Sequence, residues 1–125
     1  RTFELVKKEV PQIGDILTFF LTHDSALLRK QLPHTIFTDK HPREVLRLLK
    51  EKGYKEALVA GGGILNSAFL KEDLIDEMYV DIEPLILGHG IPLFADGDFE
   101  TRLKLLGVKT LSNHQTIQLH YKVIK

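Results

Sequence analysis

The chain has 125 residues, and 17 lysine and arginine residues balance 17 aspartate and glutamate residues, which gives a formal net charge of zero. Its length suits a single domain over residues 1–125, and its 43% hydrophobic and 27% charged residues exclude a disordered, collagen-like or low-complexity chain. The balanced charge argues against a nucleic-acid partner. The lack of cysteine excludes disulfides and thiolate chemistry and fits a cytoplasmic protein, and no apolar run is long enough to span a membrane.

The first third of the chain predicts a helix followed by two short strands. Residues 2–9 have helical composition, and Pro11 ends that helix. Residues 16–21 form an apolar run of strand length, and residues 35–37 are a second strand candidate. Residues 26–32, between the two strands, favour neither helix nor strand.

The clearest helix signal follows the second strand. Asp39 or His41 opens the helix, and Pro42 suits its first turn. Apolar residues at helical spacing then share one face, and Gly53 stands where a glycine commonly ends a helix.

The rest of the chain predicts a strand, a helix, another strand and a hairpin. Residues 57–60 indicate a buried strand that leads through three glycines into a helix at residues 64–70, and a strand follows at residues 77–82. Residues 115–125 alternate between apolar and polar side chains, and residues 102–111 are their expected antiparallel partner. This order predicts an α/β fold with one mixed sheet, helices on its faces and a C-terminal antiparallel hairpin.

The glycines Gly61, Gly62 and Gly63 are the first candidate site. Between a strand and a helix they allow a ligand to approach the backbone closely, and a helix start offers unpaired N–H groups and a positive dipole end to a phosphate. The segment matches neither the dinucleotide fingerprint nor the phosphate-binding P-loop, so a tight strand-to-helix turn is the alternative explanation.

Two loops are further candidates. Residues 22–25 (Thr-His-Asp-Ser) follow a strand, where open α/β sheets collect ligands, although the segment taken alone favours a solvated loop with a helix cap. Residues 84–94 are a loop rich in apolar residues, which we expect to be packed, to bind a flat ligand or to meet another subunit. The six histidines have no metal-ligand spacing, so we expect no metal.

Several of these segments together resemble a known family. The runs VAGGGILNSAFL and LIDEMYVDIEPLILGHGIPLF, with RTFELV at the start and THDS after the first strand, are similar to the reductase domain of riboflavin biosynthesis and its relatives in the dihydrofolate-reductase-like superfamily. The resemblance covers essentially the whole chain, and its most specific parts are the triple glycine and the apolar loop.

The resemblance implies a dihydrofolate-reductase-like fold that binds NADPH. It puts Thr2 near the cofactor phosphates, and Thr22 and His23 beside the adenosine 2′-phosphate. It also allows one Gly–Gly bond to be cis, as in dihydrofolate reductases. The pyrophosphate would be held by Gly61, Gly62 and Gly63 with the N–H groups of Ile64 and Leu65.

The chain departs from the family pattern at two places. The family segment that carries the first strand and much of the nicotinamide and substrate pocket would precede Arg1, so we expect a domain without its N-terminal strand and name no catalytic residue. Ala60 stands where riboflavin reductases typically carry glutamate, which favours the folate-reductase-like relatives.

Two functions follow from the resemblance. One is an NADPH-dependent reductase of a pterin-like or ribosylaminopyrimidine substrate. The other is a catalytically inactive nucleotide-binding or dimerisation module of the same fold. In either case residues 86–94 or the C-terminal strand would form a homodimer contact. A flavodoxin-like protein is less favoured, because antiparallel C-terminal strands do not suit an all-parallel sheet.

Overall fold

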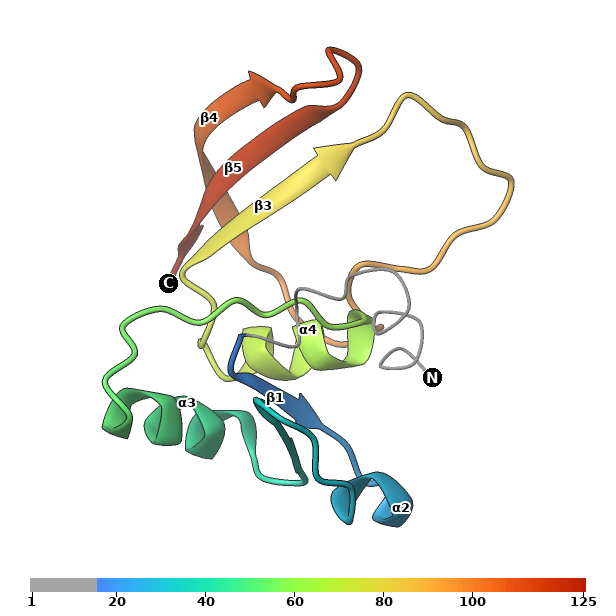
Figure 1. The fold of residues 1–125 in the computed structure, drawn as a ribbon. Coiled ribbons are helices and arrows are strands. Elements are labelled where there is room, and N and C mark those ends of the chain that lie inside the picture. Colours follow the sequence, from blue (N-terminus) through green and yellow to red (C-terminus); the bar gives the residue numbers. More distant parts are fainter. Residues whose placement is uncertain (1–15) are drawn as a thin grey trace. The chain divides into compact units, whose positions relative to one another are not determined.

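The computed structural model describes residues 16–125 (Figure 1). The chain divides into two compact units, and the boundary in the sequence lies between Gly62 and Gly63. The predicted helix at residues 2–9 and the candidate Thr2 lie outside the described residues. In this part of the chain, no helix is long and apolar enough to cross a membrane.

The first unit contains a parallel pair of strands. Strands β1 (Thr18–Leu21) and β2 (Thr35–Thr38) run in register from Thr18 opposite Thr35 to Leu21 opposite Thr38, which confirms both predicted strands. The ambiguous segment between them contains the short helix α2 (Ser25–Leu28), whose N-terminus is capped by the Asp24 carboxylate.

Helix α3 (Pro42–Glu51) follows β2 and confirms the clearest helix prediction. His41 is the N-cap and its Nδ1 atom accepts a hydrogen bond from the Arg43 N–H at 3.3 Å, while Pro42 occupies the first turn. Gly53 has a φ of +91°, the left-handed conformation that favours glycine after a helix.

The strand predicted at residues 57–60 is wrong. The segment is irregular, none of its backbone groups pairs with another described residue, and Leu58 is 88% exposed. An apolar run of four residues becomes a strand only where a neighbouring strand accepts its N–H and C=O groups. In the described part of the first unit, β1 and β2 pair only with each other.

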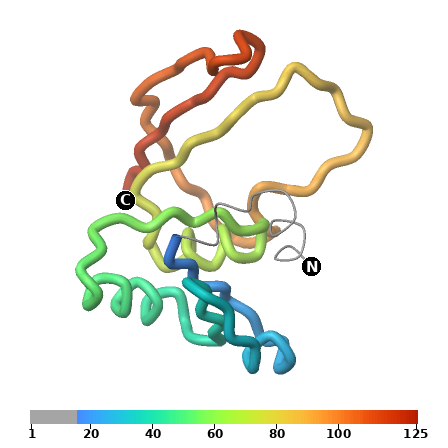
Figure 2. Tube along the Cα trace, viewed as in Figure 1, coloured from blue at the N-terminus to red at the C-terminus, as the bar shows by residue number. Residues whose placement is uncertain are grey.

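The second unit contains helix α4 (Gly63–Lys71) and the strands β3 (Glu77–Ile82), β4 (Arg102–Thr110) and β5 (Ile117–Ile124). The strands form an antiparallel sheet in the order β3-β5-β4, so the predicted C-terminal hairpin is confirmed. A long loop leaves β3 and returns to β4 (Figure 2). Phe69 and Val123 are buried in this unit.

The sheet of the second unit has one apolar and one polar face. The register aligns Met78, Tyr121 and Leu105 in one row, and Val80, Leu119 and Val108 in the next row of the same face. The opposite face carries charged and polar side chains from all three strands. The α/β class is therefore confirmed, while the strands pair as one parallel and one antiparallel sheet among residues 16–125 rather than as a single mixed sheet.

Candidate cofactor site

Two threonines mark the carboxyl ends of the parallel strands in the first unit. The Thr22 N–H donates to the Thr38 carbonyl oxygen at 2.8 Å, so the chain segments after β1 and β2 lie side by side. The Thr22 hydroxyl accepts from the Asp24 N–H, and the Thr38 hydroxyl accepts from the Lys40 N–H, each at 3.1 Å. Each strand therefore ends in the same threonine-anchored turn.

These turns gather groups that suit an anion. The Thr22 hydroxyl accepts one hydrogen bond and keeps its own hydrogen, which it can donate to a phosphate oxygen, whereas Thr38 is buried. His23 is exposed beside Thr22, and Lys40 adds an exposed cation after β2. This edge of a parallel sheet is where open α/β folds bind ligands.

Sequence reasoning identified Thr22 and His23 and missed Thr38 and Lys40. The signal was present, because a threonine stands two residues before a charged residue at the end of each strand, at Thr22-His23-Asp24 directly after β1 and at Thr38-Asp39-Lys40, where Thr38 is the last residue of β2. The sequence does not show that the two turns lie beside each other, because this depends on β1 and β2 being parallel neighbours.

The first turn of α4 is a second place that suits a phosphate. Gly62 precedes the helix and has no side chain with which to cap it. In the described chain, no acceptor takes the N–H groups of Ile64 and Leu65, and Ile64 is 82% exposed. Free N–H groups at the positive end of a helix dipole fit the pyrophosphate of a dinucleotide.

Gly63 has a different role from the two glycines before it. A Cβ atom at Gly63 would lie 2.9 Å from the Pro92 carbonyl oxygen and 3.2 Å from the Ala95 nitrogen. The Ala95 N–H donates to the Gly63 carbonyl oxygen at 3.1 Å. The missing side chain of Gly63 therefore lets the end of the long loop pack closely against the first turn of α4.

Two polar side chains of α4 hold the same loop, and sequence reasoning missed both. The Asn66 Nδ2 atom donates to the Leu93 carbonyl oxygen at 2.9 Å. The Ser67 hydroxyl donates to the Ala95 carbonyl oxygen at 3.2 Å and accepts from the Ala95 N–H at 2.8 Å. Ser67 is buried, and the available signal was the adjacent polar pair Asn66 and Ser67 within a mostly apolar helix.

The remaining site predictions divide between the two units. Thr22, His23, Gly61 and Gly62 belong to the first unit, and Gly63 opens the second with Ile64 and Leu65. The expected cis Gly–Gly bond is wrong, because residues 16–125 contain no cis peptide bond. A cis bond between non-proline residues costs about 3 kcal/mol and needs surroundings that enforce it, and nothing lies within 4 Å of a Cβ at Gly62.

The apolar loop at residues 84–94 is exposed rather than packed. Five large apolar side chains in it are between 53% and 99% exposed, namely Leu85, Ile86, Leu87, Ile91 and Leu93. Gly88 and Gly90, which flank His89, have no positive φ, so these two glycines do not mark a constrained backbone. The expectation that the loop is packed is therefore wrong for these side chains. The other two expectations, a bound ligand or a contact with another subunit, remain.

Comparison with known proteins finds a matching family and curated relatives. The family described as RibD C-terminal domain matches residues 12–117. The chain is 40% identical over 88 residues to the uncharacterized protein YwjB of Bacillus subtilis (strain 168), which covers 70% of this chain and 49% of YwjB. The chain spans about half the length of the curated relatives it matches.

Solved structures show the same likeness. A Shewanella sp. PV-4 protein, provisionally named a riboflavin biosynthesis protein, has a TM-score of 0.69 and 25% identity, covering 86% of this chain and 60% of its own. RibD of Acinetobacter baumannii has a TM-score of 0.58 and 34% identity, covering 73% of this chain and 27% of its own.

Proposed function

The chain belongs to the RibD C-terminal domain family and has a riboflavin-biosynthesis reductase-like fold, and from this we propose that it is an NADPH-dependent reductase of a pterin-like or ribosylaminopyrimidine substrate. The observation that carries the proposal is the first turn of α4. That turn offers free N–H groups behind a glycine without a capping side chain.

The chain's own residues bind and orient the cofactor in this proposal. Gly61 and Gly62 let the pyrophosphate reach the N–H groups of Ile64 and Leu65, while Gly63 lets the long loop pack on the same helix turn. Thr22 and His23 would contact the adenosine 2′-phosphate, together with Lys40 from the neighbouring turn of the same unit. The family resemblance also assigns Thr2, outside the described residues, to the cofactor phosphates. Bound NADPH supplies the hydride, and the protein supplies the position of the nicotinamide.

Cofactor titration tests the proposal. We expect NADPH to bind more tightly than NADH by about tenfold or more, because the 2′-phosphate gains charge-assisted hydrogen bonds. Lys40→Ala should reduce the NADPH affinity and leave the NADH affinity unchanged. Lys55→Ala, which removes an exposed lysine elsewhere in the same unit, is the control. Equal affinities for the two cofactors, measured by calorimetry, would contradict the role of this edge.

The inactive-module alternative is favoured by one observation, the alanine at position 60 where riboflavin reductases typically carry glutamate. Oxidation of NADPH with dihydrofolate, other pterins and the ribosylaminopyrimidine intermediate separates the two functions. Turnover on one of these substrates supports the reductase. Cofactor binding with no turnover on any of them supports the module.

A homodimer is a second proposal, and it rests on the exposed loop. Five exposed apolar side chains in nine residues exceed what a monomer normally leaves in water, and a second copy of this chain would cover them. We expect light scattering of the protein to give twice the monomer mass, and the double variant Ile86→Asp/Ile91→Asp to give the monomer mass. A monomer at all micromolar concentrations of the unmodified protein would reject the proposal.

A further inference from the structure

The polar face of the antiparallel sheet carries an aromatic pair of fixed geometry. Tyr79 on β3 and His120 on β5 are cross-strand partners, and their rings are stacked with centroids 4.1 Å apart and planes 8° apart. The His120 Nε2 atom lies 3.2 Å from a carboxylate oxygen of Glu77, which fixes the orientation of the imidazole. One face of the imidazole is therefore covered by Tyr79, and its other face is turned toward β4.

The residue of β4 opposite His120 has no side chain. Gly107 pairs with His120 directly after an irregularity in the register between Leu105 and Gly107. A Cβ atom built at Gly107 would meet nothing within 4 Å, so the space beside the imidazole is open. A glycine and a bulge inside a strand commonly mark a place where a ligand approaches the backbone closely.

Two lysines lie in the neighbouring row of the same face. Lys104 on β4 and Lys122 on β5 are opposite each other, one row from Gly107 and His120. Like charges on directly opposed residues of a sheet repel each other, and neither lysine forms an ion pair within residues 16–125.

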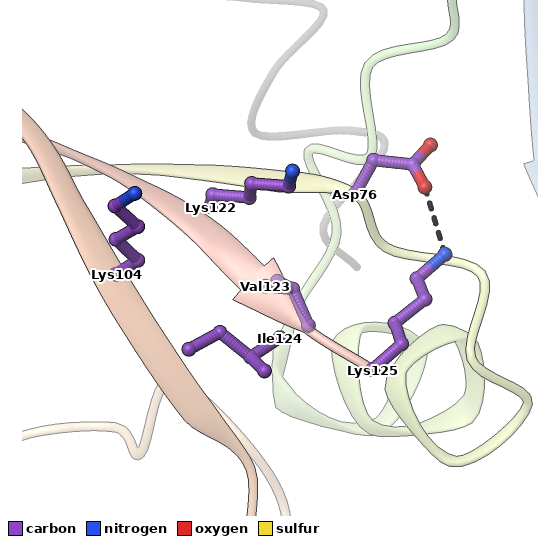
Figure 3. Close-up of a pocket in the computed structure, with 6 residues that line it drawn as sticks. All are labelled: Asp76, Lys104, Lys122, Val123, Ile124 and Lys125. Carbon is purple, nitrogen blue, oxygen red and sulfur yellow. Dashed lines mark hydrogen bonds and ion pairs between the residues drawn. The ribbon is translucent and has the colours of Figure 1, made fainter.

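The same two lysines line a shallow pocket of about 420 Å³ together with Asp76, Val123, Ile124 and Lys125, and Gly107 and His120 lie one row away, outside this lining. Figure 3 shows Lys104 and Lys122 extending from neighbouring strands, while Lys125 is turned to Asp76, with which it forms an ion pair at 2.7 Å. The carboxylates of this face lie on β3, the neighbour of β5, and Glu77 is the register partner of Lys122. Glu77 is hydrogen-bonded to His120 and Asp81 to Gln118. Lys104 and Lys122, which form no ion pair within residues 16–125, are therefore the cations available to an anion.

From this juxtaposition we propose that the polar face binds a small planar aromatic compound that carries a phosphate or carboxylate. The ring stacks on the free face of His120 above Gly107, and the anionic group lies between Lys104 and Lys122. Two residues of a strand span about 6.6 Å, a gap that long lysine side chains in the neighbouring row can bridge toward an anionic group carried by the ring. This site involves no residue of the proposed cofactor site and is independent of it.

Nuclear magnetic resonance of the isotope-labelled protein with 1-naphthyl phosphate tests the proposal. We expect the Gly107 amide and the His120 ring resonances to shift on titration. Affinity for 1-naphthyl phosphate should exceed the affinities for 1-naphthol and for inorganic phosphate by about tenfold each, because the phosphate adds charge-assisted contacts and the ring adds stacking. It should also fall as the salt concentration rises.

Two variants remove the two halves of the site separately. Gly107→Val fills the open space, and the fold should tolerate it because no atom lies within 4 Å of the new Cβ and Gly107 has no positive φ. Lys104→Gln/Lys122→Gln removes the cations. Each variant should weaken binding about tenfold, whereas Lys55→Gln should not. Gly107→Ala replaces the valine variant if that variant unfolds.

Four outcomes would overturn the proposal. If 1-naphthol binds as tightly as its phosphate, the contact is only apolar, and if inorganic phosphate binds as tightly as the aryl compound, the site is only an anion site. If the titration does not shift the resonances of Gly107 and His120, the aromatic ring does not stack on His120. If Gly107→Val keeps full affinity, the ring does not lie above Gly107.

Discussion

Replacing Gly62 with valine is expected to abolish NADPH binding and to leave the protein folded. Nothing lies within 4 Å of a Cβ at this position, and Gly62 has no positive φ, so the substitution introduces neither a clash nor backbone strain. Gly62 directly precedes the turn with the free N–H groups of Ile64 and Leu65, so we expect the isopropyl group to obstruct the approach of a phosphate to them. A hydrogen bond to a charged group contributes about 1.5–3 kcal/mol, so the loss of two such bonds lowers the affinity about 100-fold or more.

The measurement is calorimetric titration with NADPH, with thermal unfolding of the same samples. Gly88→Val is the matched control, because Gly88 is also a glycine with no neighbour within 4 Å of its Cβ, and it lies in the exposed loop. We expect the control to bind NADPH normally. A Gly62→Val protein that unfolds at the normal temperature and still binds NADPH would show that the α4 start does not hold the pyrophosphate.

The elements that the sequence predicted well have their signals within the element itself. Helix α3 has its capping residue, a proline in its first turn and a glycine after its end, and the structure uses all three. Strand β3 occupies the predicted residues, and β5 has the strict alternation of a strand with one apolar face. Each of these signals acts over a few residues, so tertiary contacts are not needed to read them.

The features that the sequence missed depend on partners far away in the chain. Residues 57–60 have the composition of a buried strand, but a strand exists only where another strand pairs with it, and no local pattern records that partner. The hydrogen bonds from Asn66 and Ser67 to the long loop join residues 27 and 28 positions apart. The spacing of neither residue indicates which carbonyl group it will meet.

Some residues of the candidate site were likewise predicted from local sequence, and others were missed because their role depends on distant partners. The glycines were found because three of them in a row stand at the start of a helix, and the polar segment was found because it follows the apolar residues of β1, so composition alone is informative at both places. Thr38 and Lys40 were missed because their relation to Thr22 rests on one hydrogen bond between parallel neighbours, from the Thr22 N–H to the Thr38 carbonyl oxygen. Strand register is not contained in the residues that surround Lys40.

Gly63→Ala is the substitution we expect to destabilise the protein most. Its Cβ would lie 2.9 Å from the Pro92 carbonyl oxygen and within 3.3 Å of two further backbone atoms, at Ala95 and Phe94. A backbone atom cannot swing away as the end of a long side chain can. The loop would have to shift, and the hydrogen bond from the Ala95 N–H to the Gly63 carbonyl oxygen would lengthen or break.

Overpacking of this kind costs about 1–3 kcal/mol in the free energy of unfolding, which urea denaturation can measure. Alanine is the better helix former, so helix propensity alone predicts stabilisation by up to about 1 kcal/mol and the opposite sign. Gly62→Ala, one residue earlier and with open space around its Cβ, should leave stability nearly unchanged. If Gly63→Ala were as stable as Gly62→Ala, the loop would not rest on the first turn of α4. The triple glycine would then serve a ligand at all three positions, rather than a ligand at the first two and the chain itself at the third.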